Sequence, residues 1–130
     1  MDINIWAVLV AAVSSFLLGG LWYSPALFLK PWNKAMNRTE EDDQPHPARA
    51  FGLGFVFSLV AAFIFANLIG PEPELRYALH IALMVGAGLV ATSFGINYQF
   101  ANRPFSALFI DGGYHIGQFV LFALILGLWH

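Results

Sequence analysis

The stretch that decides the fold reads Arg103-Pro-Phe-Ser-Ala-Leu-Phe-Ile-Asp111-Gly-Gly-Tyr-His115-Ile-Gly-Gln118, and an apolar run follows it to the C-terminus. From Ser106 onward it is long and apolar enough to cross a bilayer, which takes roughly 20 helical residues. At about 100° per residue, Asp111, His115 and Gln118 fall within about 60° of one another on such a helix. This polar seam on an apolar span marks the place to look for a function.

The composition is that of a membrane protein. Of the 130 residues, 58% are hydrophobic and only 11% are charged, whereas a soluble domain has about 25% charged residues. Four segments contain no Asp, Glu, Lys or Arg, and each is about as long as a membrane-spanning helix: residues 3–29, 50–71, 77–102 and 112–130. We therefore expect an all-α integral membrane protein built as a four-helix bundle.

A short amphipathic helix is predicted directly after the first span. Ser24 and Pro25 favour a helix start. The residues that follow would form a helix with an apolar face and a basic face. This pattern is typical of a helix that lies in the membrane interface, here kinked at Pro31. The expected layout is one domain over residues 1–130, with spans at about 3–23, 51–69, 76–98 and 106–129, the interfacial helix at about 25–36 and a cytoplasmic loop at about 37–50.

The positive charges predict the orientation in the membrane. Lys and Arg in short loops favour the cytoplasmic side, whereas acidic runs such as residues 40–43 count for little. Five of the six cationic residues flank the loops after the first and third spans: Lys30, Lys34, Arg38, Arg49 and Arg103. We therefore expect both termini outside the cell, in a multi-pass inner-membrane protein. Aromatic residues that anchor helix ends at the interface are expected at Trp22, Trp32 and Trp129.

Small residues recur every fourth position along the first two spans. Such stripes let helix backbones approach closely. They occur in the first span at Ala7, Ala11, Ser15 and Gly19, and in the second at Gly54, Ser58, Ala62 and Ala66. Because these stripes exceed what one narrow bundle obviously needs, we expect a homo-oligomer of undetermined order.

Polar residues from three spans are expected to meet near the cytoplasmic side. Asn97 and Asp111 lie at similar distances from the Arg103 loop, roughly 9–12 Å along their helices. The predicted cluster contains Tyr23, Asn97, Asp111, Tyr114, His115 and Gln118. One interpretation is a site where Asp111 binds a small solute, cation or proton and His115 relays or gates it, since ionisable residues inside a membrane mark functional sites. The other is that the seam only packs helices, within a structural or partner-binding module.

Several other functions find no support in the sequence. There are no cysteines, and a pair such as Asp111 and His115 lacks the further ligands that a metal site requires. His80 and His115 are expected at different depths, which disfavours a haem held between them. No catalytic motif occurs, so we expect neither an enzyme nor a bound cofactor or metal. No basic tail indicates nucleic acid, so the expected partners are the lipid bilayer and further copies of the chain.

Two groups of residues resemble a known family. The first is Gly20-Leu-Trp-Tyr-Ser-Pro25 with Phe28, Lys30 and Trp32; the second is Thr92, Asn97, Phe100, Arg103-Pro104, Asp111-Gly-Gly-Tyr-His115 and Leu126-Gly-Leu-Trp129. Together they resemble a bacterial membrane-protein family catalogued as domain of unknown function 1761. The resemblance implies a four-helix integral membrane protein and no assigned activity. It also implies an amide in many members where this chain has Asp111, which weakens any mechanism that needs a charge there.

Overall fold

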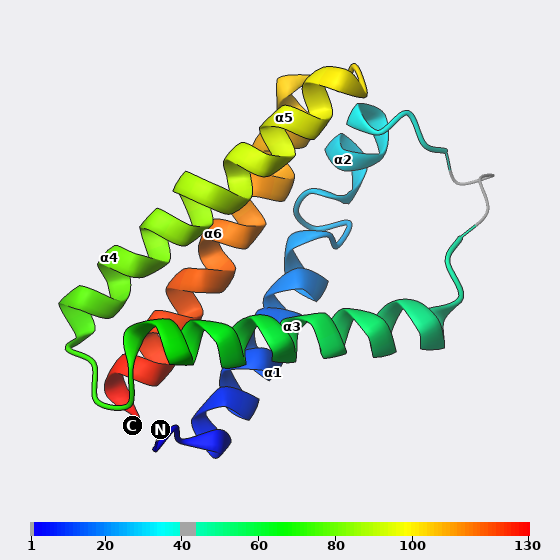
Figure 1. Ribbon diagram of the computed structural model, residues 1–130. Helices are drawn as coiled ribbons and strands as arrows, with labels where there is room; N and C mark the ends of the chain where they lie inside the picture. The colour runs from blue at the N-terminus through cyan, green and yellow to red at the C-terminus, as the bar shows by residue number, and fades with distance from the viewer. Residues whose placement is uncertain (1, 40–43) are drawn as a thin grey trace.

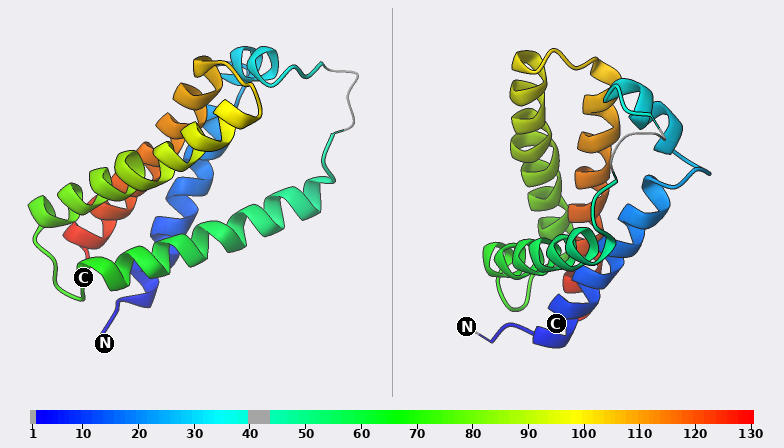
Figure 2. Two further views of the ribbon diagram at one scale, coloured as in Figure 1. Left: turned by 45° about the horizontal axis from the view of Figure 1, so that its top comes forward. Right: turned by 90° about the vertical axis from the view of Figure 1, so that its right-hand side faces the viewer.

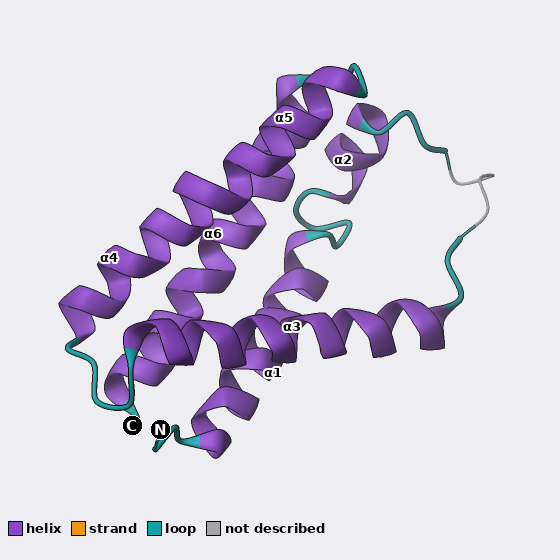
Figure 3. Ribbon diagram, in the orientation of Figure 1, coloured by secondary structure: helices purple, strands orange, loops and turns teal. Residues whose placement is uncertain are grey.

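The fold is all-helical, as expected. A computed structural model describes residues 2–39 and 44–130, and no strand occurs among them (Figure 3). Four helical segments are long and apolar enough to cross a membrane, so the chain is a multi-pass membrane protein. The elements are α1 (Ile5–Trp22), α2 (Leu29–Ala35), α3 (Pro47–Ile69), α4 (Leu75–Val85), the π-helical η1 (Gly86–Ala91), α5 (Thr92–Phe100) and α6 (Phe105–Leu128) (Figure 1).

Helix α6, the one with the polar seam, is the centre of the bundle. It packs against α1 on one side and against α4 and η1 on the other (Figure 1). Its second half carries Phe119 and Phe122, whose rings lie 5.4 Å apart. Both contact the buried ring of Phe65 from α3, at 5.7 and 6.1 Å between ring centroids. These three rings fill the interior of the bundle at the end nearer the two termini.

The small-residue stripes are packing faces inside one chain. Ala7, Ala11 and Ser15 of α1 are buried, and so are Ser58, Ala62 and Ala66 of α3. Because α1 contacts both α3 and α6, close approach of these backbones needs no second copy of the chain. The pattern from which a homo-oligomer was expected is therefore accounted for within the protomer.

The third span changes its helical period in the middle. Residues 86–91 are wound as a π-helix between α4 and α5, a feature that occurs frequently at functional sites. Gly86 permits the contact there, because a Cβ atom on it would lie 3.0 Å from the Cα of Ile116 in α6. The π-helical turns thus pack against α6 at the level of His115 and Ile116.

The two ends of the bundle differ. Both termini lie at one end, and α2 lies at the other with the α5–α6 connection (Figures 1 and 2). Helices α2 and α5 are each followed by an asparagine with positive φ, Asn37 at 58° and Asn102 at 54°. This conformation terminates a helix and reverses the chain. The guanidinium group of Arg103 then donates a 2.9 Å hydrogen bond to the carbonyl of Met36, which joins the two connections.

The boundaries differ from expectation around the first loop. Helix α3 begins at Pro47, because proline is favoured in a first helical turn, so residues 47–50 are helical and not part of the loop. Helix α2 begins at Leu29, since residues 24–28 form turns, and Pro31 lies in its first turn, where it breaks no helical hydrogen bond. The acidic run at residues 40–43 lies outside the described residues.

The first half of α3 stands away from the bundle. All of its buried residues lie at or beyond Ser58, and its first turns diverge from α5 and α6 (Figures 1 and 2). Helix α1 contacts it there through the ring of Phe16, which packs edge-on against Phe51 and Phe55. This divergence opens the bundle on the side where the polar seam faces.

Candidate functional site

Asp111 is the centre of a hydrogen-bonded cluster. Its side chain is only 6% exposed. One carboxylate oxygen, Oδ1, accepts hydrogen bonds from the hydroxyl of Tyr23 at 2.5 Å and from Nε1 of Trp32 at 3.0 Å. The other oxygen, Oδ2, accepts a hydrogen bond from the hydroxyl of Tyr98. One carboxylate on α6 is therefore held by donors from the end of α1, from α2 and from α5.

Neighbouring contacts fix α6 against the end of α1. The indole Nε1 of Trp22 donates a 2.8 Å hydrogen bond to the carbonyl of Ile110. Gly113 makes room for this indole, because a Cβ atom there would lie 3.0 Å from it. One turn further along, the hydroxyl of Tyr114 donates a 3.0 Å hydrogen bond to the carbonyl of Ser15. The backbone around Asp111 is thereby fixed on both sides of the carboxylate.

His115 and Gln118 form a second polar pair on the seam. Nδ1 of His115 lies 2.8 Å from Oε1 of Gln118. The imidazole ring is stacked on Phe94 of α5, with ring centroids 5.2 Å apart and planes 20° from parallel. His115 is therefore hydrogen-bonded to Gln118 and not to Asp111.

A cavity of about 690 Å³ opens between α1, α2, α6 and the diverging half of α3. We call it the aromatic cavity. Asp111 lines it together with five aromatic side chains: Phe16, Tyr23, Trp32, Phe51 and Tyr114. The pocket therefore combines one carboxylate with several π-faces in a largely apolar wall.

A second cavity, of about 430 Å³, adjoins the first along the seam. We call it the seam cavity. His115 and Gln118 line it, and it shares Gly54, Ser58 and Tyr114 with the aromatic cavity. Beyond it lie the packed rings of Phe65, Phe119 and Phe122. The two cavities therefore share part of their walls, and Phe119 of the packed rings also lines the seam cavity.

No cation neutralises Asp111 within the described ranges, where its oxygens contact only Tyr and Trp donors. Arg103, a nearby cation, instead donates to the carbonyl of Met36. No group of three or more His, Cys, Asp or Glu residues able to hold a metal occurs in residues 2–39 and 44–130. The carboxyl group that faces the aromatic cavity is thus held by neutral donors.

The sequence predicted the centre of the site but not all of its members. Tyr23, Asp111 and Tyr114 lie together around the aromatic cavity, and His115 and Gln118 line the seam cavity. Asn97 is exposed, and the next residue, Tyr98, bonds to Asp111 in its place. The expected distance from the Arg103 loop was nearly the same for Tyr98 as for Asn97. Which of the two side chains faces α6 depends on the π-helical turns before them.

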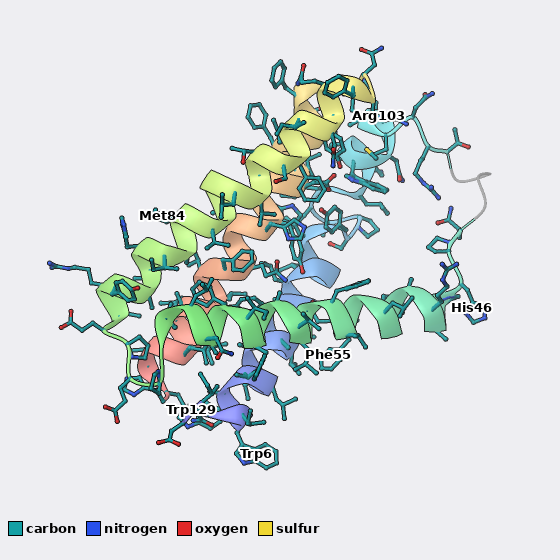
Figure 4. The ribbon with its side chains drawn as sticks, in the orientation of Figure 1. Trp6, His46, Phe55, Met84, Arg103 and Trp129 are labelled. Atoms are coloured by element: carbon teal, nitrogen blue, oxygen red, sulfur yellow. The ribbon has the colours of Figure 1, made fainter. Side chains whose placement is uncertain are left out.

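Two of the tryptophans expected as interfacial anchors also belong to the site. Trp22 and Trp32 donate hydrogen bonds to Ile110 and Asp111 of α6. Their expected positions at the membrane interface suited a lipid-facing role equally well, so nothing marked them as donors. Trp129 is 47% exposed at the opposite end of the bundle from Arg103 (Figure 4), and its anchoring role stays a prediction.

The profile of the family described as "Protein of unknown function (DUF1761)" matches residues 6–127, nearly the whole chain. The chain belongs to this family. This confirms the resemblance carried by the Trp-Tyr-Ser-Pro and Gly-Tyr-His segments. Comparison with curated proteins and with solved structures finds no match, so the function of this DUF1761 protein has to be argued from its own site.

Proposed function

We propose that this DUF1761 protein binds a small organic cation in the aromatic cavity, with Asp111 as its counter-charge. The observation that carries the proposal is a buried carboxylate that faces an aromatic cavity without a cation in the described chain. An ionised Asp near the centre of a membrane helix costs about 2.5–3.5 kcal/mol on insertion scales. Hydrogen bonds from neutral donors stabilise it, and a bound cation would neutralise it.

The aromatic lining favours an organic cation over a bare metal ion. Cations are attracted to the faces of Trp, Tyr and Phe rings by about 0.5–2 kcal/mol each. Metal ions prefer several oxygen ligands, whereas the cavity offers one carboxylate whose two oxygens already accept three hydrogen bonds. A substituted ammonium needs only one anionic contact and apolar walls for its carbon atoms.

The packed rings beside the seam cavity support binding rather than conduction. A path through the protomer would have to pass the rings of Phe65, Phe119 and Phe122, which are at most 8% exposed. Each buried aromatic ring of this kind stabilises the folded chain, so opening the path would cost several of these contacts. We therefore place the small solute or cation in a site and not in a pore.

The cavity mouth is proposed to lie on the cytoplasmic side of a bacterial inner membrane. It lies beside α2, which carries Lys30 and Lys34, at the end of the bundle opposite both termini (Figure 1), and clustered cations favour the cytoplasm. One chain supplies the whole cavity. Homo-oligomerisation is therefore compatible with the proposal but not needed for binding.

Calorimetric titration with phenethylammonium chloride tests the proposal. This probe carries one ammonium group and one aromatic ring. Asp111→Asn should weaken binding at least about thirtyfold, because removing one partner of a buried charge pair costs about 2 kcal/mol or more. Asp2→Asn, an acid-to-amide change at an exposed position near the other end of the bundle, should leave the affinity unchanged. Equal affinity of wild type and Asp111→Asn would refute the proposal.

A second candidate is a structural role for the seam. The observation in its favour is that three donors from three elements already satisfy Asp111 without a ligand. In that case Asp111→Asn would lower the stability of the protein, and phenethylammonium would bind neither form. The titration therefore separates the two candidates.

A further inference from the structure

The His115–Gln118 pair presents a hydrogen-bonding pattern that no residue in the described ranges 2–39 and 44–130 uses. We propose that this pair recognises a hydroxyl or carboxamide group on the bound molecule. The inference rests on the proposed cation site and deepens it, because it states what the molecule carries at the end away from its ammonium group.

The pattern follows from one distance. Nδ1 of His115 lies 2.8 Å from the amide oxygen of Gln118, and in a neutral imidazole one nitrogen donates while the other accepts. If Nδ1 donates to the oxygen, Nε2 of His115 is left as an acceptor and the amide nitrogen of Gln118 as a donor. If the amide is turned by 180°, Nδ1 accepts, and the outward atoms exchange roles.

With either assignment, the two outer atoms of the pair are therefore one donor and one acceptor. Charged groups do not match this pattern: a carboxylate has only acceptors, and an ammonium has only donors. A hydroxyl or a primary carboxamide has both. The pair is thus complementary to a neutral polar group, which also suits a cavity inside a membrane.

The outward atoms are open to the seam cavity. In residues 2–39 and 44–130 no buried side-chain nitrogen or oxygen lacks a hydrogen-bond partner. The hydrogen bond between His115 and Gln118 uses only their inner atoms. Their outer atoms must therefore be accessible, and the cavity that both residues line is where a ligand would meet them.

The pair is held rigid before any ligand arrives. His115 is stacked on Phe94, and the edge of its ring packs against Tyr114 at 4.8 Å. Gln118 is 5% exposed. A pre-organised site loses less conformational entropy on binding than a mobile one.

The spacing of Asp111, His115 and Gln118 along α6 indicates the length of the bound molecule. Asp111 lies four residues before His115 and seven before Gln118, which is about 6–10 Å along a helix. The two cavities share Gly54, Ser58 and Tyr114 in their walls. An ammonium group at Asp111 and a hydroxyl group at the pair would thus be separated by roughly one aromatic ring.

Tyramine and phenethylamine form a matched pair of probes, because they differ only by the phenolic hydroxyl. Calorimetric titration of the wild-type protein should give about five- to tenfold tighter binding of tyramine, the contribution of one well-made hydrogen bond. Gln118→Met, which keeps the length of the side chain, should reduce this ratio to about one. The exposed amide of Asn97 supplies a control, and Asn97→Leu should retain the wild-type ratio.

A wild-type ratio of one, or a ratio that survives in Gln118→Met, would overturn the inference. His115→Phe, which keeps the stack on Phe94, should also bring the ratio to one and replaces Gln118→Met if that variant does not fold. A third probe, 4-ethylphenol, has the hydroxyl but no ammonium. If it binds in a Gln118-dependent way while phenethylamine does not bind, the pair is a recognition site and the cation proposal fails. If phenethylamine binds through Asp111 and the hydroxyl adds nothing, only the present inference fails.

Discussion

The hydroxyl of Tyr98 on α5 donates a hydrogen bond to the carboxylate of Asp111 on α6, thirteen residues further along the chain. Through this contact the third span binds the same carboxylate as the end of α1 and as α2. Tyr98→Phe should therefore destabilise the protein by about 1.5 kcal/mol, near the upper limit measured for hydrogen bonds between membrane helices. Thermal unfolding followed by tryptophan fluorescence measures the difference. Asn97→Ala, one residue away and exposed, should change the melting temperature little, and equal losses in both variants would contradict this arrangement.

Trp32 attaches α2 to the bundle through its hydrogen bond to Asp111. In Trp32→Phe the ring stays but the donor is lost, so α2 should open more often. Hydrogen–deuterium exchange should become faster in residues 29–35 while exchange in α4 stays as it was. Trp6→Phe is the matched control, because Trp6 is 71% exposed. Unchanged exchange of α2 in Trp32→Phe would mean that the hydrogen bond does not hold this helix.

Gly86 and Gly88 in the π-helical segment should respond in opposite ways to the same substitution. A Cβ atom at Gly86 would lie 3.0 Å from the Cα of Ile116, whereas at Gly88 it would meet nothing within 4 Å. Gly86→Ala should therefore cost about 1–3 kcal/mol through overpacking. Gly88→Ala should be neutral or stabilising by up to about 1 kcal/mol, since alanine restricts the unfolded chain. Comparison of their melting temperatures checks both values, and a tolerated Gly86→Ala would show that α6 does not approach so closely.

The proposed orientation can be tested directly, because the chain contains no cysteine. A membrane-impermeant maleimide applied to intact cells should label Glu72→Cys, in the exposed α3–α4 turn, without lysis. Ala101→Cys, exposed at the end of α5, should be labelled only after lysis. The reverse pattern would place the mouth of the aromatic cavity outside the cell.

The fold could be predicted from the sequence because one strong physical constraint determines it. Charged residues are excluded from the bilayer core, so the gaps between them mark the four spans. The position of Asp111 was found in the same way, as a charge inside a span. Neither prediction required knowledge of how the helices pack against one another.

The partners of Asp111 could not be predicted in full because they depend on helix rotation and on turns. Tyr98 and Asn97 are adjacent, and the π-helical residues 86–91 shift which of them faces α6. Trp32 reaches Asp111 because the turns at residues 24–28 place α2 against α6. Pairwise hydrogen bonds of this kind leave no periodic pattern in a single sequence.

In the proposed site an ammonium group lies against the Asp111 carboxylate. Solid-state NMR tests this contact with protein carrying ¹³Cγ-labelled aspartate and with ¹⁵N-labelled phenethylammonium, where Asp111→Asn identifies the Asp111 signal by its disappearance. The Asp111 signal, and no other aspartate signal, should be dephased by the ¹⁵N label when the probe saturates the protein. Saturation without dephasing of that signal would show that the cation binds elsewhere, against the proposal.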